Sequence, residues 1–189
     1  MFFRVFLLLG IFTLVPRDAK ACGGVTGIVG TALGCRVAVS IFGYANQGLS
    51  IATSVLSGEL ANEASHSSFP PDKKDPIKKK LIGSSTAHGV ASLFGLGAAS
   101  SFLFFHPGKG DTADARHNRS MALVIMSGIS TLSALVGLGL NGAAYAEMPD
   151  IDMTESMKAK AMIGSSITST VLDAIGTAFA LTVAHQNAS

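Results

Sequence analysis

The stretch KAKAMIGSSITSTVLDAIGTAFALTVA, residues 158–184, decides the fold of this chain. Two lysines open it, small and apolar residues fill it, and Asp173 is the only Asp, Glu, Lys or Arg that follows Lys160. A helix needs about 20 predominantly apolar residues to cross the roughly 30 Å hydrocarbon core of a bilayer. The stretch therefore predicts a transmembrane helix that carries one acid inside the membrane.

Three further apolar runs precede this one. The four candidate spans cover residues 37–61, 81–105, 120–144 and 161–184. Only 14% of the 189 residues are charged, against about 25% in ordinary soluble domains, and the mean hydropathy is +0.46. Because lipid cannot satisfy free backbone N–H and C=O groups, runs of this length form helices. The sequence predicts an all-α integral membrane bundle of four transmembrane helices.

The second and fourth spans begin almost identically. At an offset of 81 residues, Ile82-Gly83-Ser84-Ser85 aligns with Ile163-Gly164-Ser165-Ser166. This match predicts a duplicated two-helix hairpin, with residues 37–105 as the first copy and residues 120–189 as the second. Parallel repeats of this kind are related by a pseudo-two-fold axis along the membrane normal.

The N-terminus has the pattern of a secretory leader. Arg4 precedes an apolar run over residues 5–15, and Ala19-Lys20-Ala21 is a small-x-small cleavage pattern. We expect residues 1–21 to be a signal peptide, with a retained short anchor helix as the alternative. In both cases the glycine-rich segment 22–36 begins outside the cytosol.

Positive charge predicts the orientation of the spans. The loops 62–80 and 145–160 together hold seven Lys or Arg residues, whereas the rest of the chain after the leader holds four. We therefore expect these two loops in the cytosol. The loop 106–119 and both mature termini are expected on the non-cytosolic side, which agrees with insertion through the secretory pathway.

Three residues on the predicted non-cytosolic side are candidates for covalent modification. Cys22 and Cys35 flank a glycine-rich loop, and a disulfide between them is plausible in an oxidising compartment. The alternative is a pair of free, buried thiols. Asn118 lies in an N-x-S sequon, but it is so close to a span that we expect inefficient glycosylation.

Polar residues recur every four positions in the two related spans, which places them on one helix face. In the second span these residues are Ser84, His88 and Ser92. In the fourth span they are Ser165, Ser169, Asp173 and Thr177. If the pseudo-symmetry holds, the two polar stripes face each other across the axis, and Asp173 occupies the position of Ser92.

Asp173 is the sharpest candidate for a functional residue. A charged aspartate at the centre of a bilayer costs about 2.5–3.5 kcal/mol on insertion scales, so it is kept where it faces a bundle interior or a wet cavity. One interpretation is an ion or proton site, with His88, Asn46 and Gln47 as candidate partners. The other is a hydrogen-bonded aspartate that fixes helix packing.

Two functions follow as expectations. The leading one is a non-enzymatic structural or assembly subunit that packs against copies of itself or against other membrane proteins, because small residues recur at four-residue spacing in the spans. The alternative is a channel, proton-linked transporter or ion-carrying subunit that uses Asp173. The sequence contains no recognised motif for a cofactor, a metal or an enzyme, and its net charge of +2 does not favour nucleic acid.

Overall fold

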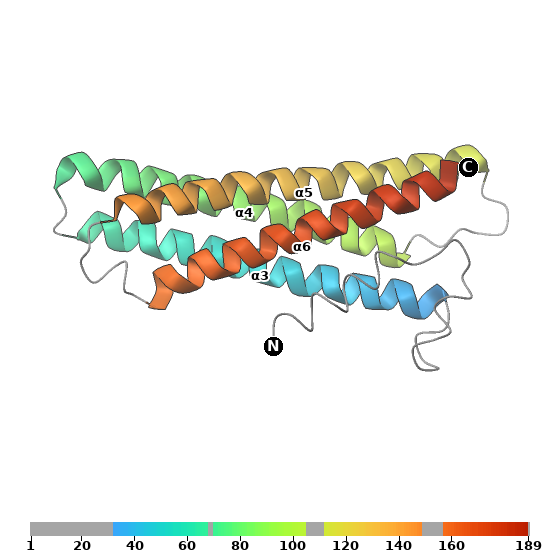
Figure 1. Cartoon of the computed structure of the whole chain (residues 1–189), viewed down its shortest axis with the longest axis horizontal. Coiled ribbons are helices and arrows are strands. Elements are labelled where there is room, and N and C mark those ends of the chain that lie inside the picture. Colours follow the sequence, from blue (N-terminus) through green and yellow to red (C-terminus); the bar gives the residue numbers. More distant parts are fainter. Residues whose placement is uncertain (1–31, 68–69, 105–111, 149–156, 189) are drawn as a thin grey trace.

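The computed structural model describes residues 32–67, 70–104, 112–148 and 157–188. These residues form four long helices and, within those ranges, no strand. The helices are α3 (Ala32–His66), α4 (Pro71–Phe104), α5 (Ala113–Glu147) and α6 (Met157–Ala188) (Figure 1). The prediction of an all-α chain is confirmed for this part of the sequence.

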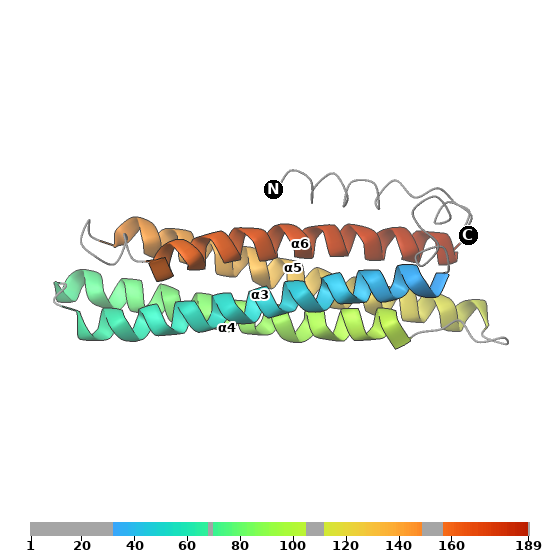
Figure 2. The same ribbon diagram turned by 90° about the horizontal axis from the view of Figure 1, so that it is seen from below.

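The four helices form one elongated bundle. Helix α3 packs against α4 and α6, and α5 packs against the same two helices, so α4 and α6 lie diagonally opposite each other. Figure 2 shows neighbouring helices running antiparallel. The C-terminal ends of α3 and α5 and the N-terminal ends of α4 and α6 meet at the same end of the bundle (Figure 1). We call this end the lysine end.

The helices are longer than the predicted spans, and the connections are correspondingly shorter. Only residues 67–70 separate α3 from α4, so most of the expected loop 62–80 is helix. The Pro70 carbonyl accepts hydrogen bonds from the amides of Lys73 and Lys74, both at 3.0 Å. Pro71 is thus the first helical residue, where its missing N–H costs nothing.

Helix α5 also begins and ends within the expected loops. The Thr112 side chain accepts a bond from the Ala115 amide at 3.2 Å and caps the N-terminus. At the other end the Met148 amide bonds back to the carbonyls of Ala144 and Tyr145. Residues expected in the loops 106–119 and 145–160 therefore extend α5, by about two turns at its N-terminal end and by slightly less than one turn at its C-terminal end.

One described helix is long and apolar enough to cross a membrane on its composition alone. It is α5, over Asp114–Glu147, with a mean hydropathy of 2.0 in its most apolar window. Such an average does not distinguish residues that face the bundle from residues that face outward.

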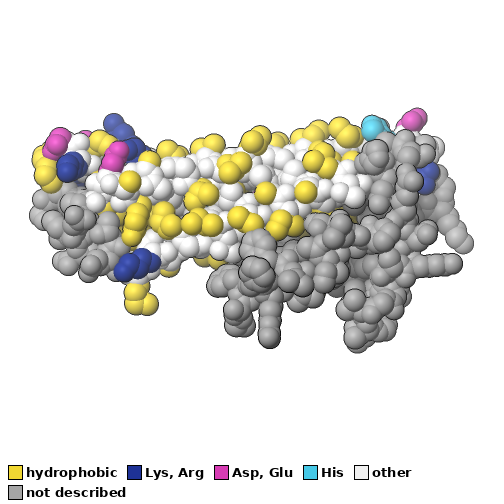
Figure 3. All heavy atoms as spheres, viewed as in Figure 1, with side chains coloured by type: hydrophobic (Ala, Val, Ile, Leu, Met, Phe, Trp, Pro, Cys, Tyr) yellow, Lys and Arg dark blue, Asp and Glu magenta, His cyan; other side chains and the backbone are white. Residues whose placement is uncertain are grey.

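The middle of the bundle is polar inside and apolar outside. Its buried side chains include Ser50, His88 and Asn141, each of which is completely enclosed. Its outward side chains include many large apolar residues, with Leu93 70% and Leu132 65% exposed. Figure 3 shows apolar side chains scattered along the central length of one face, with charged side chains at the ends. This is the reverse of a water-soluble bundle.

The lysine end has the opposite arrangement. A cluster of buried apolar residues fills its centre, built around Leu60, Ile77, Leu81 and Met162. Charged side chains cover its surface (Figure 3), and they include an ion pair between Lys80 and Glu147. The polarity of the bundle therefore changes along its length, from the pattern of a soluble protein to its inverse.

Several predictions fall on residues outside the described ranges. These are the leader at 1–21, most of the segment 22–36, and Cys22 with its disulfide to Cys35. They stay predictions. The backbone of residues 32–36 belongs to the first turns of α3.

Candidate functional site

Asp173 lies inside the bundle and is held by neighbouring helices. Its side chain projects from α6, and the residue is 6% exposed. The Oδ1 atom accepts hydrogen bonds from Asn46 Nδ2 at 2.8 Å and from Gln47 Nε2 at 3.1 Å, both on α3. Ser130 Oγ on α5 lies 3.1 Å away. The structure thus brings Asn46 and Gln47, two of the three candidate partners, to the acid.

Ser130 is a partner that the sequence did not reveal. Its hydroxyl lies 2.8 Å from the Ala91 carbonyl on α4 and 3.1 Å from Asp173. A hydroxyl carries one proton, so Ser130 donates to one of these acceptors at a time. Asp173 therefore has two firm donors and one that it shares with the backbone of α4.

Three oxygen atoms of this cluster are buried and lack a hydrogen-bond partner in the described structure. They are Asp173 Oδ2, Asn46 Oδ1 and Gln47 Oε1. The two amide residues are 4% and 2% exposed, respectively. A buried polar atom without a partner carries a desolvation cost of about 1–3 kcal/mol. Three such acceptors in one cluster indicate a site that is short of donors.

A cavity of about 140 Å³ adjoins the cluster. All four helices contribute to its wall, and Asp173, Asn46, Gln47 and Ser130 form most of its polar part. The remaining wall is largely apolar, and it consists of Phe42, Gly43, Gly95, Ala98, Ala99, Phe102, Leu123, Ser127, Leu172, Ile175, Gly176, Phe179 and Ala180. These residues lie from Asp173 towards the end of the bundle away from the lysine end.

Glycine on α4 makes room for the amide cluster. A Cβ atom at Gly95 would overlap the amide group of Gln47. A Cβ atom at Gly43 would lie 2.8 Å from Ala99 Cβ, so α3 and α4 approach each other closely here. Close approach of this kind is typical of small residues at membrane helix interfaces, and the absence of a side chain at Gly95 leaves room for the Gln47 amide.

His88 belongs to a separate cluster and does not contact Asp173. Its Nε2 atom lies 2.9 Å from Ser166 Oγ on the diagonal helix α6, and its Nδ1 atom lies 3.5 Å from Ser50 Oγ. Ser50 also donates to the His88 carbonyl at 3.2 Å. The ring packs against Gly137, where a Cβ atom would lie 2.7 Å from two ring atoms.

The two polar stripes point into the bundle, but their members bond differently. Ser84 donates to the Gly137 carbonyl at 2.9 Å, and Ser165 accepts from Thr53 at 2.8 Å. Thr177 donates to the Ser127 carbonyl at 2.8 Å. These three residues therefore join neighbouring helices through their side chains.

Ser92 and Ser169 instead donate to carbonyls of their own helices. Ser92 and Asp173, which the predicted repeat aligns, thus have different surroundings. The serine bonds within α4, whereas the acid binds side chains from two other helices. Asp173 therefore lies in a cluster of polar side chains, whereas Ser92 does not.

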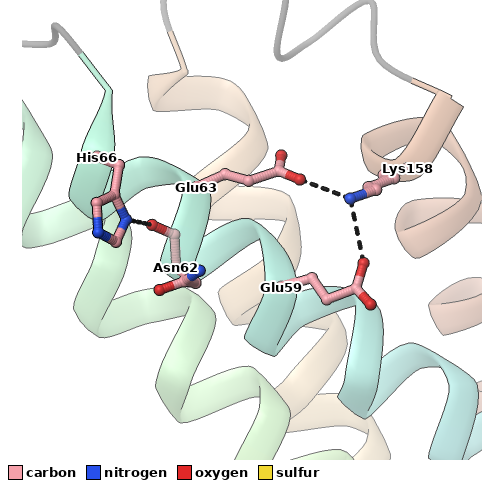
Figure 4. Close-up of polar contacts among 5 residues, drawn as sticks. All are labelled: Glu59, Asn62, Glu63, His66 and Lys158. Carbon is pink, nitrogen blue, oxygen red and sulfur yellow. Dashed lines mark hydrogen bonds and ion pairs between the residues drawn. The ribbon is translucent and has the colours of Figure 1, made fainter.

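The charged surface at the lysine end includes two acids that the sequence reading did not single out. Lys158 Nζ lies 2.6 Å from Glu63 and 3.2 Å from Glu59, which are one turn apart on α3 (Figure 4). Lys158 donates hydrogen bonds to Glu63 and Glu59, and these bonds, the one to Glu63 first, raise the pKa of Lys158 above its usual value. The two ion pairs of Lys158 join the start of α6 to the end of α3.

Within the described ranges, no group of three or more His, Cys, Asp or Glu residues could hold a metal. Asn118 is exposed within the second turn of α5. The chain matches no protein-family model, no curated protein and no solved structure.

Proposed function

We propose that the chain is a multi-pass integral membrane protein in which all four helices span the bilayer. The support is the apolar outer surface of the central bundle around a polar interior, since lipid replaces water as the solvent of the outer face. The helices contain 35, 34, 35 and 32 residues. At about 1.5 Å per residue each is roughly 50 Å long, so the ends project beyond a 30 Å hydrocarbon core.

The orientation follows from the lysine end. Lys73, Lys78, Lys79 and Lys160 are exposed or half-buried there, and positively charged ends stay in the cytosol. The loops 62–80 and 145–160 would then be cytosolic, and the mature termini non-cytosolic. The buried apolar cluster and the charged surface at this end are consistent with a segment that lies in water outside the bilayer.

Within this bundle we propose that Asp173 and its neighbours form a binding site for a cation or a proton. The observation that carries the proposal is the buried carboxylate beside a cavity, with three buried oxygen acceptors that lack a partner. An acid in a membrane interior that faces a cavity is the usual setting of an ion or proton pathway. A cation would supply the missing partners and neutralise the charge.

The test is cation and proton flux through the purified protein in liposomes. Asp173→Asn keeps the shape of the side chain and removes its charge, so flux should fall to the level of protein-free liposomes. Ser92→Ala is the matched control, because this serine occupies the corresponding position of the other repeat, and its flux should stay at the wild-type level. Absence of flux in a folded wild-type protein would rule out transport.

A second candidate, an oligomeric structural subunit, is supported by one outward face of α3. Ala45, Gly48 and Ala52 are exposed and lie on one side of the helix, and nothing approaches within 4 Å of a Cβ atom at Gly48. Small residues at this spacing allow a second helix to pack closely. We expect Gly48→Leu to dissociate a homo-oligomer in detergent, whereas Gly128→Leu on α5 leaves it intact. A monomeric wild-type protein would exclude self-association.

A further inference from the structure

We propose that the cavity beside Asp173 binds a primary ammonium ion that carries a small apolar body, such as an arylalkylamine. This inference rests on the proposed function of Asp173 as a cation site, and it names the class of cation. It is carried by the match between the cavity and such a molecule in hydrogen bonding, charge, volume and wall chemistry.

The number of hydrogen-bond donors on the ligand matches the number of free acceptors in the cavity wall. A primary ammonium group has three N–H donors and no acceptor. The cluster offers three buried acceptors without a partner, namely Asp173 Oδ2, Asn46 Oδ1 and Gln47 Oε1. All three residues are more than nine-tenths buried and line the cavity. An ammonium group at the polar wall would therefore satisfy three atoms that the described structure leaves unsatisfied.

The charge match favours a monovalent cation. Asp173 is the one ionisable residue among those that line the cavity in the described structure. No Lys, Arg or His belongs to the wall, so the carboxylate has no internal counter-ion there. A single positive charge neutralises it, whereas a divalent cation would leave an uncompensated charge in an apolar cavity at a large desolvation cost.

The volume and the wall favour an organic cation over a metal ion. The cavity of about 140 Å³ is close to the 150 Å³ apolar cavity that binds benzene in another protein. Phe102 and Phe179 pack edge to face with ring centroids 5.3 Å apart, and Phe42 also lines the wall. A metal ion would leave most of this space to water, which needs two to four polar partners per molecule.

The aromatic wall adds a second attraction for the same ligand. Apolar groups gain free energy when they leave water for such a wall. The body of the ligand would lie among the phenylalanines while its ammonium group lies at Asp173. The apolar cluster around Leu60 and Met162 fills the bundle at the lysine end, so entry is from the opposite half.

The experiment is isothermal titration calorimetry of the full chain in lipid nanodiscs, with empty nanodiscs as the blank. The probes are benzylamine, benzyl alcohol, methylamine and sodium chloride. We expect benzylamine to bind saturably. Benzyl alcohol lacks the charge and should bind at least about tenfold more weakly, since hydrogen bonds to charged groups are the stronger ones. Methylamine lacks the apolar body and should bind roughly a hundredfold more weakly.

Two variants test separately how the polar wall and the apolar space of the cavity contribute to ligand binding. Asp173→Asn should weaken benzylamine binding at least about tenfold because it removes the charge. Gly176→Leu should abolish binding because its side chain would project from the cavity wall. Gly164→Leu is the matched control: it lies on the same helix, it also has open space at its Cβ position, and it does not line the cavity. Its affinity should equal that of the wild type.

The outcomes distinguish this inference from the proposed function. Equal binding of benzylamine and benzyl alcohol, or equal affinity in the wild type and in Asp173→Asn, would overturn the ammonium site. Sodium binding or proton flux that depends on Asp173, without benzylamine binding, would overturn the ligand class and leave the cation site standing. Absence of binding by every cation, together with absence of flux in the folded protein, would overturn both.

Discussion

Gly137→Ala tests the packing between α4 and α5 most directly. The added Cβ atom would lie 2.7 Å from His88 Cδ2 and 2.7 Å from His88 Nε2. Ordinary contacts between such atoms are about 3.5–4.0 Å, so the approach is about 0.8 Å too short. The ring cannot turn away freely, because Ser166 holds Nε2 at 2.9 Å, and Ser84 ties the Gly137 carbonyl to α4 at 2.9 Å.

The magnitude follows from two opposing effects. Overpacking of a filled interior typically costs about 1–3 kcal/mol. Replacement of glycine by alanine within a helix returns about 0.8–1.0 kcal/mol. The net loss of unfolding free energy for Gly137→Ala is therefore about 0–2 kcal/mol. Gly139→Ala is the control, since nothing lies within 4 Å of its Cβ position, and it should be neutral or stabilising by up to about 1 kcal/mol.

The assay is reversible unfolding in mixed micelles, followed by circular dichroism. The difference between the two alanine variants should be about 1–3 kcal/mol, and His88→Ala in the Gly137→Ala background should remove most of it. A double-mutant cycle gives this coupling energy. Equal stabilities for Gly137→Ala and Gly139→Ala, or a coupling energy near zero, would refute the close contact between His88 and Gly137.

Three further predictions concern other contacts. Gly43→Ala should destabilise the bundle relative to Gly48→Ala by about 1–3 kcal/mol, since its Cβ meets another Cβ at 2.8 Å whereas Gly48 has open space; equal unfolding midpoints would contradict this. Ser130→Ala should cost about 1–2 kcal/mol through the lost hydrogen bond, measured in the same assay, and no cost would show that this bond is dispensable. The raised pKa of Lys158 predicts that its contribution to stability is complete below the unfolded lysine pKa of about 10.4 and is lost as pH rises through the folded value. The midpoints of wild type and Lys158→Met should therefore converge at alkaline pH, and a constant difference from neutral pH upward would count against the ion pair.

The helices were largely predictable from the sequence, and their ends were not. Apolar runs locate the four helices because they contain very few charged residues, namely Glu59 in the first run and Asp173 in the fourth. The first connection carries the signals of a loop, including Pro70, Pro71 and Pro76. Yet Pro71 starts α4 and Pro76 lies within it, because a proline in the first turns of a helix removes few backbone hydrogen bonds. Exposed polar residues therefore extend the helices past the apolar runs.

The site was predictable only in part, for a geometric reason. A buried acid needs donors, and Asn46 and Gln47 lie at a suitable position along the first span. Ser130 is one of many serines in this chain, and its contact depends on how α5 is rotated about its axis. His88 shares a helix face with Ser84 and Ser92, yet the rotation of α4 aims it at Ser166. Periodicity gives the face of a residue, but it does not give the facing partner.

The change of polarity along the bundle has a consequence for how stability depends on temperature. The heat capacity of unfolding reflects the apolar surface that becomes exposed to water. If the central bundle stands in lipid as proposed, its outward apolar residues meet no water in either state, and its inward serines and asparagines expose little apolar surface. The cluster around Leu60, Ile77 and Met162 at the lysine end would then supply most of the heat capacity change. We therefore expect the free energy of unfolding to change little in slope with temperature. A polar substitution at Leu60 should lower the heat capacity change of unfolding further.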